Sequence, residues 1–185
     1  NFFDLLGDDY QIDISELVVG SENSIVYDAD GNEIAVLSSG TKRVSVSLDE
    51  MSPYLPKAYV AIEDERFYDH SGVDFKRTAA ATVTFITHGG KSSFGGSTIT
   101  QQVVKNITND KEDTALRKIK EMVKALQFEH YLSKEQILEL YLNLIFVGGK
   151  NVNGVSLGAV YYFNKDVKDL SLAESAFLVA INPAP

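Results

Sequence analysis

The feature that most limits the fold is an apolar run with helical spacing that ends in a dense group of carboxylates. Its apolar members recur at intervals of three and four residues, the pattern of a helix that packs on a core. They are Tyr54, Leu55, Ala58, Tyr59, Ala61 and Ile62. The carboxylates that follow within seven residues are Glu63, Asp64, Glu65 and Asp69.

Like charges crowded beside apolar surface disfavour ionisation. We therefore expect one of these four carboxylates to have a raised pKa, which would suit it to proton transfer. The alternative interpretation is a solvated acidic helix end, which is the usual structural role of a charge run.

Composition limits the remaining possibilities. The 185 residues are enough for one domain with a substantial core, and 44% hydrophobic and 10% aromatic residues are typical of a globular chain. The formal net charge of −9 argues against a general nucleic-acid binder, so no nucleic-acid partner is expected. The absence of cysteine excludes disulfide bonds and thiolate chemistry.

The two ends of the sequence suggest a piece of a longer protein. The chain begins at Asn1 instead of Met, and it stops at Asn182-Pro183-Ala184-Pro185. No run approaches the ~20 apolar residues of a membrane span, and no signal peptide is visible. We expect residues 1–20 to be a linker and residues 21–185 to form the domain.

The N-terminal quarter predicts a small β element. Residues 24–27 and 33–37 flank Asp28-Ala29-Asp30-Gly31-Asn32, which has the turn chemistry of a hairpin. Residues 44–48 alternate between apolar and polar and predict a third strand.

Beyond Met51 the patterns are helical. A short apolar helix is expected over residues 76–88, followed by a glycine-rich loop over 88–96 and a capped helix from Ser97 or Thr98 to about residue 107. Capping boxes predict helix starts at Ser133 and Ser171, and another helix is expected over 154–163. The predicted fold class is therefore mainly α with a small N-terminal β-hairpin.

A long amphipathic helix is expected to begin at Asp113 or Thr114, and its charges reverse the acidic character of the chain. Its predicted apolar stripe is Leu116, Ile119, Met122, Val123 and Leu126. Its cations surround Glu121 and are Arg117, Lys118, Lys120 and Lys124. An exposed salt-bridge lattice is one interpretation. The surplus of cations, with Lys105 upstream, also suits a bound phosphate or diphosphate.

The stretch Gly95-Gly96-Ser97-Thr98-Ile99-Thr100-Gln101-Gln102 supplies a second anion-binding feature. Glycines before a helix N-terminus let backbone N–H groups approach an anion. Gln101 and Gln102 lie four and three residues before Lys105, so both amides are expected to neighbour its ammonium group. A plain loop with a Ser/Thr cap is the alternative.

An acidic site and a basic site together fit inverting glycosyl transfer from a sugar diphosphate. One carboxylate would accept a proton from the attacking hydroxyl, while the cations stabilise the departing diphosphate. The logic parallels that of inverting glycosidases, with a sugar hydroxyl in place of water.

Four motifs resemble the signatures of the peptidoglycan glycosyltransferases, family 51, found in class A penicillin-binding proteins and monofunctional transglycosylases. They occur in the family's order over roughly residues 24–185. The motifs are Glu63-Asp64-x-x-Phe67-x-x-His70-x-Gly72, Gly95 to Gln102, Arg117-Lys118-x-x-Glu121, and Ile137-Leu138-Glu139-x-Tyr141-Leu142-Asn143.

The resemblance implies a role for each matching residue. Glu63 matches the general base, and Glu121 matches a second catalytic glutamate that acts near the donor diphosphate. Substrate contacts are implied on the acceptor side for Asp64, Phe67 and His70, and on the donor side for Ser97, Thr98, Gln101, Gln102, Lys105, Arg117 and Lys118. A structural role is expected for Glu139, Tyr141 and Asn143.

The resemblance also implies the biology. The fold would be a lysozyme-like helical domain that polymerises lipid II into β-1,4-linked glycan strands and releases undecaprenyl diphosphate. Its place would be the extracytoplasmic face of the bacterial cell membrane, behind a membrane anchor. Whether a transpeptidase domain is fused after it is left open. No cofactor is firmly expected and no dedicated protein metal site is recognised, but Mg²⁺ or Mn²⁺ bridging the donor diphosphate is left open. Moenomycin would be an inhibitor.

Two departures from the family pattern fall near the donor side. Ile145-Phe146-Val147-Gly148-Gly149-Lys150 follows Asn143 where the family shows an aromatic-Gly-x-Gly pattern. The terminal Asn182-Pro183-Ala184-Pro185 replaces a more usual Leu-Pro-x-Ala-Pro. The chain also ends before the family domain normally does, which predicts a domain truncated at its C-terminal end.

Alternatives remain at this stage. A muramidase or lytic transglycosylase on a similar fold would also use an acidic residue on a helix, but it has no need of the cation cluster. A non-catalytic binding module would tolerate loss of Glu63. An apolar surface formed by Val83, Phe85, Ile86 and Phe94 is expected either to dip into the bilayer or to belong to the core.

Overall fold

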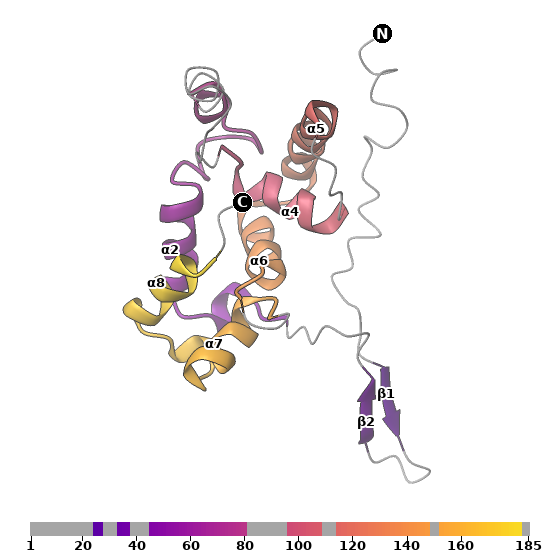
Figure 1. Cartoon of the computed structure of the whole chain (residues 1–185), viewed down its shortest axis with the longest axis vertical. Coiled ribbons are helices and arrows are strands. Elements are labelled where there is room, and N and C mark those ends of the chain that lie inside the picture. The colour runs from indigo at the N-terminus through magenta and orange to yellow at the C-terminus, as the bar shows by residue number, and fades with distance from the viewer. Residues whose placement is uncertain are drawn as a thin grey trace.

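The computed structural model describes residues 24–27, 33–37, 45–80, 96–108, 114–148 and 152–182. Most of them are helical, which confirms the predicted fold class (Figure 1). The strands are β1 (Ser24–Tyr27) and β2 (Glu33–Leu37). The helices are η3 (Leu48–Glu50), α2 (Tyr54–Glu63), α4 (Ile99–Thr108), α5 (Ala115–Tyr131), α6 (Lys134–Leu144), α7 (Val155–Phe163), η4 (Val167–Asp169) and α8 (Leu172–Ala180).

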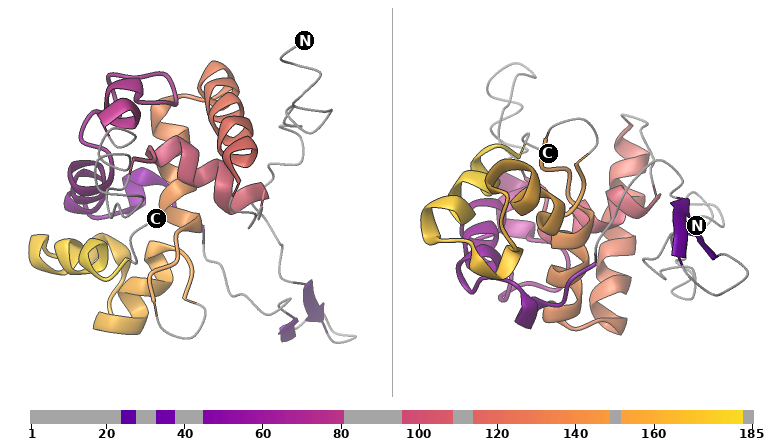
Figure 2. Two further views of the ribbon diagram at one scale, coloured as in Figure 1. Left: turned by 45° about the horizontal axis from the view of Figure 1, so that its top comes forward. Right: turned by 90° about the horizontal axis from the view of Figure 1, so that it is seen from below.

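Helix α4 is the central element of the described fold. It packs against both α5 and α6, while α2 packs against α8 (Figures 1 and 2). The face of α4 that includes Ile99 and Val103 is fully buried, as are Leu138 and Tyr141 of α6. The core therefore surrounds α4, and polar groups carried by this helix are held in fixed surroundings.

Helix α2 forms where the apolar run predicts it, but its buried face differs from the prediction. The buried residues are Leu55, Tyr59 and Glu63, which follow one another at intervals of four. Ile62 is instead 67% exposed. Because residues four apart share a helix face, a carboxylate continues the stripe that Leu55 and Tyr59 begin.

Helix α5 begins as predicted, with the Thr114 hydroxyl accepting a hydrogen bond from the Arg117 N–H. Its predicted apolar stripe is wrong, because Leu116, Ile119 and Leu126 are exposed. The buried residues of the helix are Glu121, Ala125 and Phe128. The charged face of α5 is turned toward the core, where Glu121 bonds to Gln101 on α4. These polar contacts, and not the apolar periodicity used for the prediction, set the orientation of the helix.

The N-terminal hairpin is present, with Ser24 opposite Leu37 in an antiparallel pair. The third strand is wrong where it can be checked, because residues 45–47 are irregular and 48–50 form η3. The backbone N–H and C=O of Val46 bond to the side chain of Asn143 instead of to a strand. Glu139 likewise accepts a hydrogen bond from the Leu48 N–H. The predicted bracing role of Asn143 is confirmed.

The local signals at the other helix starts are also confirmed. Ser133 and Ser171 form capping boxes with Gln136 and Glu174. Gly154 precedes α7 as expected. Of the predicted helix over 76–88, residues 76–80 are helical. Its remainder, the loop up to residue 95 and the apolar surface around Phe85 and Phe94 lie outside the described residues. Within the described part, no helix is long and apolar enough to cross a bilayer.

Gly72, in the acidic loop that follows α2, packs against the backbone of α5. Its φ of +92° lies in the region that favours glycine, and a Cβ at this position would lie 2.4 Å from the Ala125 carbonyl oxygen. The Gly72 carbonyl in turn accepts a hydrogen bond of 2.6 Å from the Thr98 hydroxyl. The loop is thus fixed between α4 and α5.

We expect Gly72→Ala to lower the free energy of unfolding by at least about 2 kcal/mol, since both the backbone conformation and the close contact oppose a side chain. Urea denaturation measures the change. Ser71→Ala, at the exposed neighbouring position, is the matched control and should stay within about 0.5 kcal/mol of the parent. Equal stability of the two variants would show that the loop does not depend on Gly72.

Candidate active site

The acidic group after α2 divides into buried and exposed members. Glu63 is 8% exposed and Asp64 is fully buried, whereas Glu65 and Asp69 are exposed. The interpretation as a solvated helix end therefore fails for the first two carboxylates. Because an isolated buried carboxylate is costly, each of them requires partners in the surrounding structure.

Glu63 is held by two neutral amides. Gln102 on α4 donates from Nε2 to Glu63 Oε2 at 3.2 Å, and Asn182, just after α8, donates from Nδ2 to Oε1 at 3.1 Å. Both carboxylate oxygens thus accept a hydrogen bond from a group that has no charge and does not titrate near neutral pH. The Glu63 carboxylate is therefore oriented by neutral groups, without a cation among its described partners.

Two tyrosines complete the surroundings of Glu63. The Tyr141 hydroxyl donates to Gln102 Oε1 at 3.3 Å, and Tyr59 donates to the carbonyl of Leu178 at 3.3 Å. Burial, and next the negative charge of Glu63, raise the pKa of both hydroxyls well above its ordinary value. Both tyrosines therefore stay protonated and act as donors. The predicted core position of Tyr141 is confirmed, but its link to the site through Gln102 was not foreseen.

Glu121 has opposite surroundings. It is 4% exposed, and its oxygens contact Arg117 Nη1 at 2.6 Å, Lys118 Nζ, and Gln101 Nε2 at 3.3 Å. Lys118 also donates to Ser97 Oγ at 2.6 Å. An exposed salt-bridge lattice is therefore the wrong description of this cluster. Glu121 orients two cations and is itself saturated with donors.

The two glutamates are connected through adjacent residues of α4. Gln101 donates to Glu121 and Gln102 donates to Glu63. Consecutive side chains leave a helix in directions about 100° apart, so one turn of α4 reaches toward both neighbours. The acidic and the basic site therefore belong to one cluster, as the two-site hypothesis requires.

The start of α4 is fixed by a reciprocal pair of hydrogen bonds. The Thr98 hydroxyl accepts from the Gln101 N–H at 3.1 Å, and Gln101 Oε1 accepts from the Thr98 N–H at 3.1 Å. This capping box aims the Gln101 amide at Glu121. The spacing Thr98-x-x-Gln101 was the sequence signal that would have revealed it.

Asp64 occupies the anion position at this helix start. Its Oδ2 accepts a hydrogen bond from the Ile99 N–H at 3.0 Å and contacts His70 Nε2 at 3.0 Å. Because His70 Nδ1 accepts from the Gly72 N–H, the proton of the neutral ring lies on Nε2 and is donated to Asp64. The anion at the Ile99 amide therefore belongs to the protein. The expectation that backbone N–H groups at this helix start also approach a ligand anion stays a prediction.

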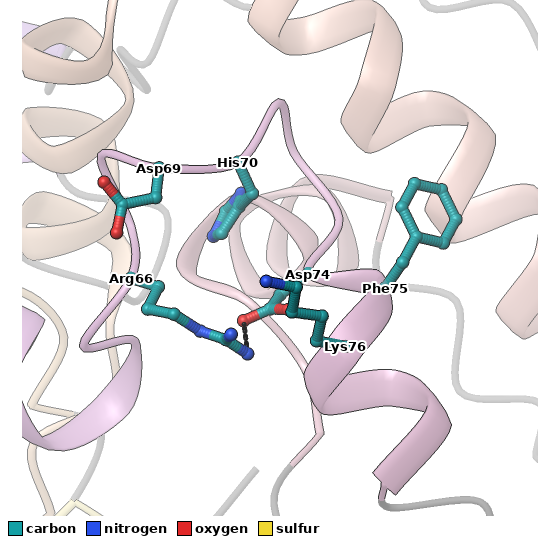
Figure 3. Close-up of a pocket in the computed structure, with 6 residues that line it drawn as sticks. All are labelled: Arg66, Asp69, His70, Asp74, Phe75 and Lys76. Carbon is teal, nitrogen blue, oxygen red and sulfur yellow. Dashed lines mark ion pairs between the residues drawn. The ribbon is translucent and has the colours of Figure 1, made fainter.

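Two pockets lie beside the same loop. One has a volume of about 250 Å³, and in Figure 3 the ring of His70 points toward the Arg66–Asp74 ion pair within it. The remaining residues that line this pocket are Asp69, Phe75 and Lys76. The second pocket, of about 480 Å³, is lined by Ala61, Ile62, Asp64, Glu65, Arg66, Asp74 and Arg77. The acidic loop therefore offers concave surface on the side where the acceptor was expected.

The other predicted site residues differ in exposure. Thr98, Gln101 and Phe67 are buried, and Phe67 lies under the Lys134 ammonium at 4.4 Å from its ring centre. Lys105 is exposed. The amides of Gln101 and Gln102 bond to the glutamates. Direct substrate contact by the buried residues Thr98, Gln101 and Phe67 stays a prediction.

The residues around Glu121 do not fit a divalent cation. Both carboxylate oxygens are already engaged by Arg117, Lys118 and Gln101, and an added ion would face two positive charges. Within the described ranges, no group of three or more His, Cys, Asp or Glu side chains is arranged to hold a metal ion.

Comparison with known protein families and relatives identifies the class of protein to which this fold and site belong. The transglycosylase family model matches residues 30–185, and the chain belongs to this family. Penicillin-binding protein 1F of Bacillus subtilis strain 168 is 43% identical over 176 residues, which cover 95% of this chain and 24% of the relative. The predicted family, and the enzyme class that its name states, are therefore confirmed.

Clostridial relatives give the same result. Penicillin-binding protein 1A of Clostridium tetani is 40% identical over 177 residues, covering 94% of this chain and 22% of the relative. Penicillin-binding protein 1A of Clostridium perfringens strain 13 is 42% identical over 178 residues, covering 95% of this chain and 26% of the relative. The chain thus spans about a quarter of the length of these curated relatives.

We expect Glu121→Gln to destabilise the fold because it leaves Arg117 and Lys118 without their anion. The loss in free energy of unfolding should be about 2 kcal/mol, below the roughly 3–5 kcal/mol of a fully buried pair, since Lys118 is partly exposed. Urea denaturation provides the measurement, with Glu65→Gln at an exposed position as the control. A Glu121→Gln variant as stable as this control would contradict the assigned role.

Proposed function

We propose that the chain is the glycosyltransferase domain of a peptidoglycan synthase, on a lysozyme-like helical fold, and that it polymerises lipid II into β-1,4-linked glycan. The observation that carries the proposal is the connection of Glu63 and Glu121 through Gln101 and Gln102. This connection puts a carboxylate that can accept a proton beside a pair of oriented cations. Inverting transfer from a sugar diphosphate needs both groups in one site.

Glu63 is the general base in this proposal. It accepts the proton of the acceptor's 4-hydroxyl while that oxygen forms a bond to the anomeric carbon of the donor sugar. The bond from this carbon to the diphosphate oxygen breaks with inversion, and the bonding electrons leave with undecaprenyl diphosphate. The neutral donors on Glu63 support this role, because they orient the carboxylate without adding positive charge.

Arg117 and Lys118 stabilise the leaving group. Both are held by Glu121, so they are oriented before substrate binds, and preorganised charge is the most effective kind of transition-state stabilisation. Glu121 therefore acts through these cations and not as a proton carrier. The charge stabilisation is assigned to the two side chains rather than to Mg²⁺ or Mn²⁺.

The setting of the reaction is part of the same proposal. The lipid-linked donor and the growing strand would be met at the extracytoplasmic face of the bacterial cell membrane. The names of the relatives support a penicillin-binding protein as the parent, with a transpeptidase domain fused to this one. A phosphoglycolipid inhibitor such as moenomycin would occupy the donor side, because it carries the same phosphate chemistry.

Glu63→Gln in the full-length protein should reduce lipid II polymerisation at least about 100-fold, since the amide cannot accept the proton. Product analysis by gel electrophoresis measures the strands formed, and thermal denaturation checks the fold. Glu135→Gln, at an exposed position on α6 that lines neither pocket, is the matched control and should keep parental activity. Supplying preformed glycan instead of lipid II separates synthesis from the muramidase or lytic alternative. Cleavage of that glycan, or full activity of Glu63→Gln, would overturn the proposal.

Charge reversal on the donor side should weaken moenomycin binding. We expect Lys105→Glu combined with Arg117→Glu to reduce affinity at least about 100-fold, because repulsion replaces attraction to the inhibitor's phosphate. Isothermal titration calorimetry provides the measurement. Lys57→Glu, which alters an exposed lysine on α2, should leave affinity unchanged. Unchanged binding by the folded double variant would show that the donor site lies elsewhere.

A further inference from the structure

Asn182 brings an amide from the far end of the chain to the proposed general base. Its Nδ2 lies 3.1 Å from Glu63 Oε1, although 119 positions separate the two residues in sequence. Gln102 occupies the other oxygen of the same carboxylate. No motif predicted the Asn182 contact, and the function proposed above does not require it.

The position of Asn182 is set by the packing of α8 on α2. The Tyr59 hydroxyl on α2 bonds to the Leu178 carbonyl on α8, and the Asn182 N–H donates to the Val179 carbonyl at 3.1 Å. These contacts fix the backbone that carries the amide. Asn182 therefore reaches Glu63 from an anchored helix end.

We propose that Asn182 is a positioning residue for Glu63, which holds the carboxylate in its ionised form and in a fixed orientation. The proposal rests on the assignment of Glu63 as the base. A hydrogen bond donated to a carboxylate favours its charged state, so the base stays available down to lower pH. The amide achieves this without a net charge that would repel the oxocarbenium-like sugar of the transition state.

Apart from Gln102, the other groups around Glu63 donate no hydrogen bond to its carboxylate and so leave this role to Asn182. On α2 and α6, Tyr59 and Tyr141 remain protonated and neutral. Asp64 follows Glu63 directly and is paired with His70. Arg77 donates to the backbone carbonyl of Glu63, not to its carboxylate. Among the described residues, the side chains that bond to the Glu63 carboxylate are thus the amides of Gln102 and Asn182.

The test is the pH dependence of lipid II polymerisation by the full-length protein. Asn182→Leu keeps a similar volume but removes the donor, so the acidic limb of the pH–rate profile should move up by roughly one pH unit. At a pH on that limb the rate should fall about tenfold. The change should lie in kcat, with KM for lipid II little altered, because Asn182 acts through the base.

Three further variants separate positioning from a structural role. Asn182→Asp adds a second carboxylate and should move the acidic limb further up, whereas Asn182→Gln keeps an amide donor and should restore most of the parental profile. Asn106→Leu removes an exposed asparagine on α4 and should match the parent. Thermal denaturation identifies any variant that fails to fold. The pH–rate profiles of the variants that do fold then decide between a positioning and a structural role for Asn182.

The outcomes distinguish this inference from the proposed function. Unshifted profiles for folded Asn182→Leu and Asn182→Asp, in a protein that still depends on Glu63, would overturn the positioning role alone. A fully active Glu63→Gln variant would overturn the proposed function and the inference with it.

Discussion

The pair of adjacent glutamines on α4 is the interaction on which the site depends. Gln101 and Gln102 reach the two buried glutamates, Glu121 and Glu63, from one turn of helix. Burial of two carboxylates in the same region is unfavourable unless each is satisfied locally. The capping box of Thr98 fixes this turn, so the start of α4 sets the geometry of both sites.

The same residue type acquires two functions through its surroundings. Glu63 receives hydrogen bonds from neutral amides, and in the proposed function it is the group that accepts the proton. Glu121 is held by two cations and orients them. Protein sites commonly separate the roles of two carboxylates in this way, by environment and not by identity. In the proposed function, this difference is how a strongly acidic chain would bind an anionic leaving group.

Sequence reasoning succeeded where structure is determined locally. The capping residues of α5, α6 and α8 act within one turn, so their patterns predicted the helix starts. The predicted apolar stripe of α5 was wrong because Glu121 faces inward, toward Gln101 on another helix. The contact of Asn182 with Glu63 was not predicted for the same reason, because the two residues are 119 positions apart and such a contact leaves no periodic pattern in the sequence. The motifs indicated which side chains belong to the site, but the hydrogen bonds between those side chains depend on how the helices pack.

The central claim is that proton removal and diphosphate binding take place on two sides of one cluster. The most direct measurement is a crystal structure of the full-length protein with a non-hydrolysable lipid II analogue in the donor position and an acceptor glycan beside it. The account predicts the diphosphate against Arg117 and Lys118, and the acceptor's 4-hydroxyl within hydrogen-bond distance of Glu63. A diphosphate bound away from these cations, or an acceptor hydroxyl remote from Glu63, would contradict it.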